Sequence, residues 1–215
     1  MDFVLHPVEV RVLGALLEKE ITTPEYYPLS LNALVNACNQ KSNRDPVVNY
    51  DDDLVEQALR SLREKNLLLS ITGAGSRVQK YGHRISERLN LGRPDLAVLC
   101  ELMLRGPQTV GELRTHAARM HSFDDLEQVQ HVLDRSPELF VKLERRPGEK
   151  ECRYAQLLSE LPPAQTEASS AAPAPAAPAA PRHDRITALE AEVATLRVDV
   201  NELREQLAGF KKQFE

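Results

Sequence analysis

The sequence predicts an α+β fold, mainly helical with small β-hairpins, and three observations support it. Apolar residues at helical spacing occur twice in the same order, and two β-prone runs around a turn close each copy. The 215 residues suffice for about two small domains. A 42% hydrophobic and 5% aromatic content without Trp suits small aliphatic cores. The clearest correspondence places Leu13, Leu16 and Leu17 against Leu99, Leu102 and Met103.

The first copy is predicted to span residues 1–85. Pro7 suits the start of a helix over 8–20, because its missing N–H costs little there. Ser30 is a predicted N-cap for a short helix over 31–39. A third helix over 51–66 begins with three aspartates, which the helix dipole favours at that end. Strands over 67–72 and 77–81 then surround a Gly-Ala-Gly-Ser turn.

The second copy, residues 86–160, repeats this order with shorter loops. A helix over 96–105 ends at Gly106-Pro107, and Thr109 with Glu112 forms a capping box for a helix over 110–120. A helix over 126–135 precedes strands over 140–145 and 151–157. Three helices followed by a hairpin is the winged-helix plan, so the sequence predicts two tandem winged-helix domains.

The remaining residues predict a linker and a coiled coil. Residues 161–183 are rich in Ala and Pro, as in semi-extended linkers. In 184–215, β-branched residues at the early a positions and Leu at d favour a parallel two-stranded coil, and hence a homodimer. Residues beside the apolar positions carry opposite charges that would pair between two chains, as Arg185 would with Glu190 of a second chain, and this also favours the coiled coil. The alternative is a helix that packs back on the domains of a monomer. The predicted dimer positions are Ile186, Leu189, Val193, Leu196, Val200, Leu203 and Leu207.

Composition and motifs predict a non-enzymatic protein of the cytoplasm. The net charge is −5, from 27 Lys and Arg against 32 Asp and Glu, so nucleic-acid binding would require local basic patches. Three distant cysteines indicate reduced thiols. The N-terminus lacks a signal-peptide pattern, and no apolar run suits a membrane span. No catalytic motif, metal-ligand spacing or cofactor loop is present, so no catalytic, metal or cofactor residue is predicted.

DNA is one predicted partner. The third helix of a winged-helix domain commonly enters the major groove, and Arg and Lys near it position the phosphate backbone. The polar loop 39–46 is longer than a connection needs, although its amides have the alternative role of bonding loop backbone and capping helices. The candidate contact residues are Lys41, Asn43, Arg44, Arg60, Arg63, Arg77, Lys80, Arg145, Arg146 and Lys150.

Another protein is the alternative partner. Asp51, Asp52 and Asp53 would face phosphates where a recognition helix begins, and both predicted domains carry a net negative charge. Acidic residues also alternate with the arginines of the second hairpin. These features favour a winged-helix module that binds proteins or assembles a complex.

Several motifs, in order, resemble the bacterial YceH family over residues 5–158. The resemblance implies tandem winged-helix domains and leaves the biochemical activity open, so it assigns no catalytic or binding residue. His116 departs from the Arg expected at that position. The motifs include Leu16-Leu17-Glu18-Lys19, Thr22-Thr23-Pro24, Tyr27-Pro28-Leu29, Asn39-Gln40-Lys41-Ser42-Asn43-Arg44, Gly111-Glu112-Leu113-Arg114 and Arg119-Met120.

Overall fold

The computed structural model describes residues 3–71, 78–145 and 148–160, and its first helix is α1 (Pro7–Thr22). Its start follows from the local sequence, because Pro7 occupies the first turn and the Glu9 carboxylate accepts the His6 backbone N–H at 2.6 Å. A 3₁₀ turn over Pro24–Tyr26 then leads into the first sheet.

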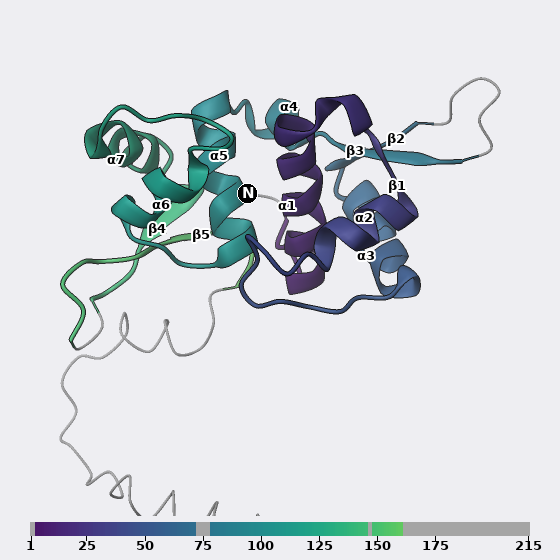
Figure 1. Cartoon of the computed structure of the whole chain (residues 1–215), viewed down its shortest axis with the longest axis horizontal. Helices are drawn as coiled ribbons and strands as arrows, with labels where there is room; N and C mark the ends of the chain where they lie inside the picture. The colour runs from purple at the N-terminus through teal and green to yellow at the C-terminus, as the bar shows by residue number, and fades with distance from the viewer. Residues whose placement is uncertain (1–2, 72–77, 146–147, 161–215) are drawn as a thin grey trace, which may run out of the picture. The chain divides into compact units, whose positions relative to one another are not determined.

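The first repeat, which runs from α1 to β3, closes with a small antiparallel sheet of strand order β1–β3–β2 (Figure 1). The Ser30 hydroxyl caps α2 at Ala33 N, and the Asp51 carboxylate caps α3 at Leu54 N. The elements after α1 are β1 (Leu29–Ser30), α2 (Leu31–Cys38), α3 (Asp52–Glu64), β2 (Leu68–Ile71) and β3 (Lys80–His83).

The second repeat, which runs from α5 to β5, has the same order. Its capping box pairs Thr109 with Glu112, as predicted. A single bridge between Gln108 and Tyr154 stands where Leu29 pairs with Tyr81 in the first repeat. The connecting helix is α4 (Ile85–Leu89), and the repeat contains α5 (Arg93–Arg105), α6 (Val110–Ala117), α7 (Leu126–Arg135), β4 (Phe140–Lys142) and β5 (Tyr154–Gln156).

Helices α1 and α5 pack against each other at the centre and join the two repeats (Figure 1). Each has ten consecutive buried residues, 9–18 in α1 and 95–104 in α5. A helix buried on all sides must be covered by a second layer, which here is the other repeat. The apolar residues of both repeats consequently form one core, and the two repeats belong to one compact unit.

The structure confirms the mixed α+β fold, and the predicted helices and hairpins of 3–160 occur in the predicted order. Their ends differ by a few residues. Three short elements, the 3₁₀ turn over Pro24–Tyr26, β1 and α4, are not among the predicted ones; α4 begins at residue 85, where the sequence places the boundary between copies. The predicted linker 161–183 and coiled-coil helix 184–215 lie outside the described residues.

Candidate functional site

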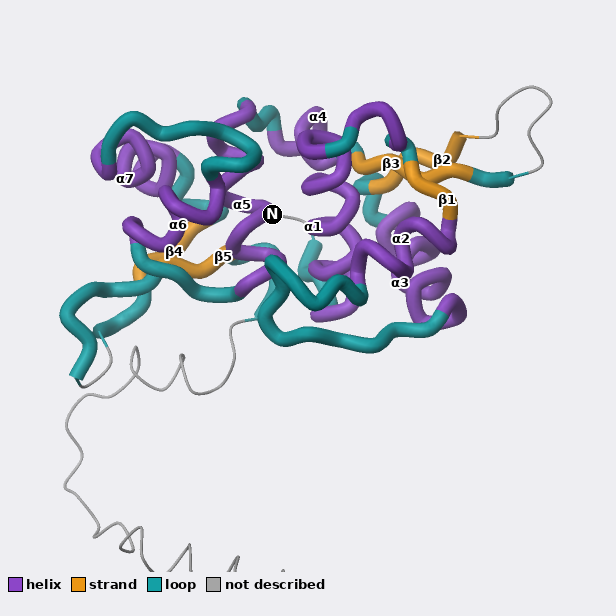
Figure 2. The backbone as a smooth tube through the Cα atoms, in the orientation of Figure 1, coloured by secondary structure: helices purple, strands orange, loops and turns teal. Residues whose placement is uncertain are grey.

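The loop between α2 and α3, residues 39–51, turns part of its polar side chains inward: Arg44 is buried, and Asn39, Gln40 and Asn43 are half-buried. The side-chain amide of Asn39 donates to the Tyr50 carbonyl and accepts from the Tyr50 backbone N–H, each at 2.8 Å, which closes the loop on itself. Figure 2 shows the loop, in teal, extending from the first repeat to the end of α5. There the Asp45 N–H donates to Leu104 O at 2.9 Å, so the loop docks on the second repeat. Lys41 stays exposed.

Arg44, predicted as a nucleic-acid contact, is instead an interior residue. Its side chain is 0% exposed, and its guanidinium binds the Glu18 carboxylate at 2.5 and 3.0 Å. It also donates to Ala37 O, and Arg11 donates to Cys38 O, so two cations lie at the C-terminal end of α2. The negative end of the helix dipole favours them there. Burial therefore withdraws Arg44 from any external ligand.

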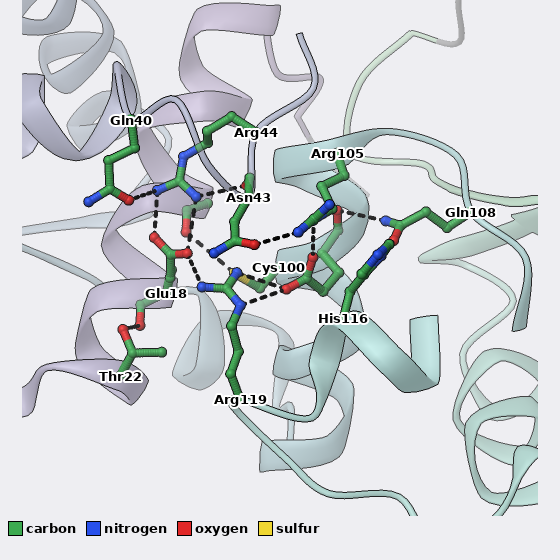
Figure 3. A network of polar contacts seen from close by, with 12 residues as sticks. Glu18, Thr22, Gln40, Asn43, Arg44, Cys100, Arg105, Gln108, His116 and Arg119 are labelled. Atoms are coloured by element: carbon green, nitrogen blue, oxygen red, sulfur yellow. Dashed lines mark hydrogen bonds and ion pairs between the residues drawn. The ribbon is translucent and has the colours of Figure 1, made fainter. Parts of the chain in front are cut away.

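Two buried carboxylates meet the same arginine at the boundary between the repeats (Figure 3). Glu18 of α1 and Glu101 of α5 are 1% and 0% exposed. Arg119, which follows α6, binds Glu18 through Nη1 and Glu101 through Nη2, the latter at 2.8 Å. Because guanidinium is planar and forked, it can hold two acceptors at once.

The network closes on itself through Arg105 and Asn43 (Figure 3). Arg105 Nε lies 3.1 Å from Glu101 Oε2, and its Nη2 donates to Asn43 Oδ1. Asn43 is the chain neighbour of Arg44, whose Nη1 donates to its carbonyl at 2.9 Å. We call this set the ion-pair ring; its members are Glu18, Asn43, Arg44, Glu101, Arg105 and Arg119.

Charge balance decides the protonation state of Glu18. Burial raises the pKa of a carboxyl, but the guanidinium groups of Arg44 and Arg119 outweigh it and hold the pKa of Glu18 below its usual value. Glu18 is therefore ionised at neutral pH. By contrast, burial raises the pKa of the Cys38 thiol to about 12, which keeps that thiol protonated and unreactive.

Five further predicted contact residues, unlike Arg44, lie on the surface of the protein. Arg60 on α3 is exposed, and Arg63 donates to Ser70 of β2 at 2.5 Å. Lys80 lies on β3, and Arg145 and Lys150 lie in the segment between β4 and β5; all three are exposed.

The remaining candidate residues are paired or lie outside the described residues. Arg153 of the second hairpin also binds carboxylates, those of Glu112 and Glu149. Asn43 belongs to the ring, and Arg77 and Arg146 lie outside the described residues.

The helix that would read DNA bases in a winged-helix domain is acidic here. Along α3, the carboxylates of residues 52, 53, 56 and 64 outnumber the guanidinium groups of Arg60 and Arg63. On α7, Glu127 and Asp134 are exposed, and Arg135 is paired with the buried Asp95 at 2.5 Å. Phosphates repel such surfaces. Neither helix face has the charge of a typical recognition helix.

A groove of about 890 Å³ runs between α3 and the start of α1. Its lining is mainly apolar and includes Leu54 and Ala58 of α3 and Val8 of α1. Val4, which borders it, is 60% exposed. At one side Lys65 binds the Glu9 carboxylate at 2.5 and 2.7 Å, so the charges beside the groove are paired.

Sequence reasoning did not identify the groove, Glu18, Glu101 or Arg119. The groove joins residues 4–9, 54–65 and 159–160, which no local pattern brings together. The two glutamates did carry a signal, because Glu101 interrupts an apolar run of its helix and Glu18 directly follows one. A charged residue at such a position is almost never fully buried unless it is paired.

The described residues contain neither a metal-binding cluster nor a membrane-spanning helix. Among residues 3–71, 78–145 and 148–160, no three His, Cys, Asp or Glu side chains are grouped so that they could hold a metal ion. Within the same ranges, no helix is both long enough and apolar enough to span a bilayer.

The fold and the ring define an α+β protein in which two internal repeats form one unit. The chain belongs to the family described as "Protein of unknown function, DUF480", whose model matches residues 5–149. It is 55% identical over 219 residues to a UPF0502 protein of Geotalea daltonii, with 100% of both chains covered. It is 55% identical over 218 residues to a UPF0502 protein of Solibacter usitatus, again with 100% of both covered.

Proposed function

We propose that this chain is a non-enzymatic protein with two tandem winged-helix modules, related to the YceH proteins, that binds another protein through its first module. The order of three helices and a hairpin occurs in each repeat, with β1 or the Gln108 bridge after the first helix, and supports the winged-helix assignment. The groove beside α3 is the observation that carries the proposed partner class.

The groove suits an amphipathic helix of a partner protein. Such helices insert apolar side chains spaced by three or four residues into apolar grooves. Val4, Val8 and Leu54 remain partly accessible along it and would lose that exposure on binding. Burial of apolar surface contributes about 25 cal/mol per Å², which makes such a contact favourable. The acidic outer face of α3 fits a protein partner better than a phosphate backbone.

The predicted coiled coil extends this proposal. Residues 184–215 would join two chains, and a partner with two copies of the recognised helix would then gain from effective concentration. The helix that packs back on its own domains is the competing arrangement. Light scattering of the full chain and of a chain truncated at residue 181 distinguishes the dimer from the monomer. If the coiled coil joins two chains, the full chain has the mass of a dimer and the truncated chain has the mass of a monomer. If the helix packs back, both have the mass of a monomer.

We expect Leu54→Arg to weaken partner binding, because the charge would enter the apolar groove. Full-length tagged protein is used to capture partners from nuclease-treated lysate. A stoichiometric partner is then purified and its affinity for each variant is measured by calorimetry. A loss of tenfold or more is expected for Leu54→Arg.

Leu126→Arg is the matched control. Leu126 is 48% exposed in the first turn of α7, so the same substitution is made at a comparable place in the other repeat. The proposal requires this variant to bind as the wild type does. Equal affinity of wild type and Leu54→Arg, or recovery of nuclease-sensitive material alone, would refute it.

Duplex DNA is the second candidate partner, and the exposed cations of the second hairpin favour it. Lys142, Arg145 and Lys150 are exposed there, whereas the helices are acidic. If DNA binds, fluorescence anisotropy from about 50 to 200 mM salt should give a log–log slope of about −0.9 per neutralised phosphate. Replacing these three residues by Glu should lower affinity for every sequence and flatten the slope. An unchanged slope would exclude this hairpin as the DNA contact.

A further inference from the structure

The ion-pair ring takes three of its members from each repeat. Glu18, Asn43 and Arg44 belong to the first repeat, and Glu101, Arg105 and Arg119 belong to the second. Two of its links cross the boundary, Arg119 with Glu18 and Arg105 with Asn43. The backbone bond from Asp45 N–H to Leu104 O crosses beside them.

We infer that the ion-pair ring is a clasp that fixes the orientation of the two repeats, with Arg119 as its positioning residue. Among the described residues, only Arg119 is bonded to a buried carboxylate of each repeat. The ion-pair ring holds the two repeats together whichever partner they bind.

Apolar packing alone does not set this orientation. The contact between α1 and α5 buries aliphatic side chains, and the hydrophobic effect has no direction. Ion pairs and forked hydrogen bonds are satisfied only in one geometry, because buried charges left unpaired are costly. The ring therefore selects one of the ways in which two apolar helices can pack.

Loss of Arg119 should loosen the clasp without unfolding either repeat. Each carboxylate keeps a cation of its own repeat, since Glu18 remains hydrogen-bonded to Arg44 and Glu101 remains ion-paired with Arg105, whose Nε lies 3.1 Å away. Each repeat then keeps a neutral ion pair, and of the two side-chain links across the boundary the one between Arg105 and Asn43 remains.

Arg119 ties Glu18, and through Glu18 the Arg44 side chain of loop 39–51, to Glu101 of α5. Without Arg119, the loop keeps its bonds from Asn43 to Arg105 and from Asp45 to Leu104, and we expect these bonds to open more readily. The closure of the loop by Asn39 and Tyr50 persists.

Hydrogen exchange of single amides tests this directly in the full-length protein. The Asp45 amide reports on the clasp, because its acceptor Leu104 O lies in the other repeat. The Tyr50 amide is bound to Asn39 within the first repeat, and the Gly106 amide to Leu102 O within the second. In Arg119→Gln, we expect Asp45 to exchange tenfold or more faster, with Tyr50 and Gly106 unchanged.

Arg153→Gln is the matched control, because Arg153 also binds two carboxylates but lies with both of them in the second repeat. It should leave the exchange of Asp45 as in the wild type. Arg119→Lys keeps the charge but lacks the fork, and should give an intermediate rate. Unchanged exchange of Asp45 in Arg119→Gln and Arg119→Lys would overturn the inference. Equal acceleration of all three amides would overturn it too, because the ring would then support only global stability.

Discussion

Replacing Glu18 by Gln is expected to lower the free energy of unfolding by about 3–5 kcal/mol. Removing one partner of a buried ion pair leaves the other charge uncompensated, and that loss has this magnitude. Here the charge left behind is the guanidinium of Arg44, which is 0% exposed. Arg119 loses its link to the first repeat as well.

Urea unfolding of both proteins at neutral pH measures this difference. Glu87→Gln is the matched control, because Glu87 pairs with Arg84 at 3.1 Å on the surface, with side chains 70% and 49% exposed. Surface pairs contribute about 0–1 kcal/mol, so this variant should stay close to the wild type. A Glu18→Gln variant within 1 kcal/mol of the wild type would contradict the assigned role of the buried pair.

The wild type and Glu18→Gln are also expected to differ in how their free energy of unfolding changes at acidic pH. The pKa of Glu18 lies below its ordinary value of 4.5 in the folded chain, so ionised Glu18 stabilises the fold above that value. This contribution is lost as the pH falls through the folded pKa. The difference between wild type and Glu18→Gln should therefore be full at pH 7 and shrink below about pH 4.5. A difference that stays constant into acid would show that Glu18 is not the titrating group.

Local sequence patterns predicted the elements well because their causes are local. Ser30, Asp51 and Thr109 cap the helices that follow them through contacts three residues away. The packing of the repeats has no such local cause. The stripe of Val12, Leu13, Leu16 and Leu17 indicates one apolar face, whereas α1 is buried all round because α5 covers the rest.

In the candidate site, too, contacts between residues far apart in the sequence could not be predicted from local patterns, and the polar loop is the example. Asn43 and Arg44 have the residue types of a nucleic-acid contact, and composition alone cannot distinguish an exposed cation from a buried one. Their partners, Arg105 and Glu18, lie 62 and 26 residues away along the chain. The alternative that the loop's amides bond backbone agrees with the contacts of Asn39.

Replacing Gly14 by Val is expected to destabilise the protein by about 3 kcal/mol through overpacking. A Cβ at this position of α1 would lie 3.0 Å from Leu104 Cδ2 and 3.1 Å from Met103 Cβ. The Leu104 methyl can rotate, but Met103 Cβ is fixed to the backbone of α5. The branched side chain must therefore push the two central helices apart. The Sγ of Cys100, which donates to Gly14 O at 3.5 Å, marks the same close approach.

Gly111→Val separates overpacking from the general effect of a β-branched residue in a helix. Gly111 lies in the first turn of α6, and its nearest atom to a new Cβ, Thr109 Oγ1, is 4.0 Å away. Val and Gly are both weak helix formers, so we expect a change of about 0.5 kcal/mol or less there. Thermal and urea unfolding of both variants would measure the contrast. Equal destabilisation at the two sites would mean that α1 and α5 do not approach as closely as Gly14 allows.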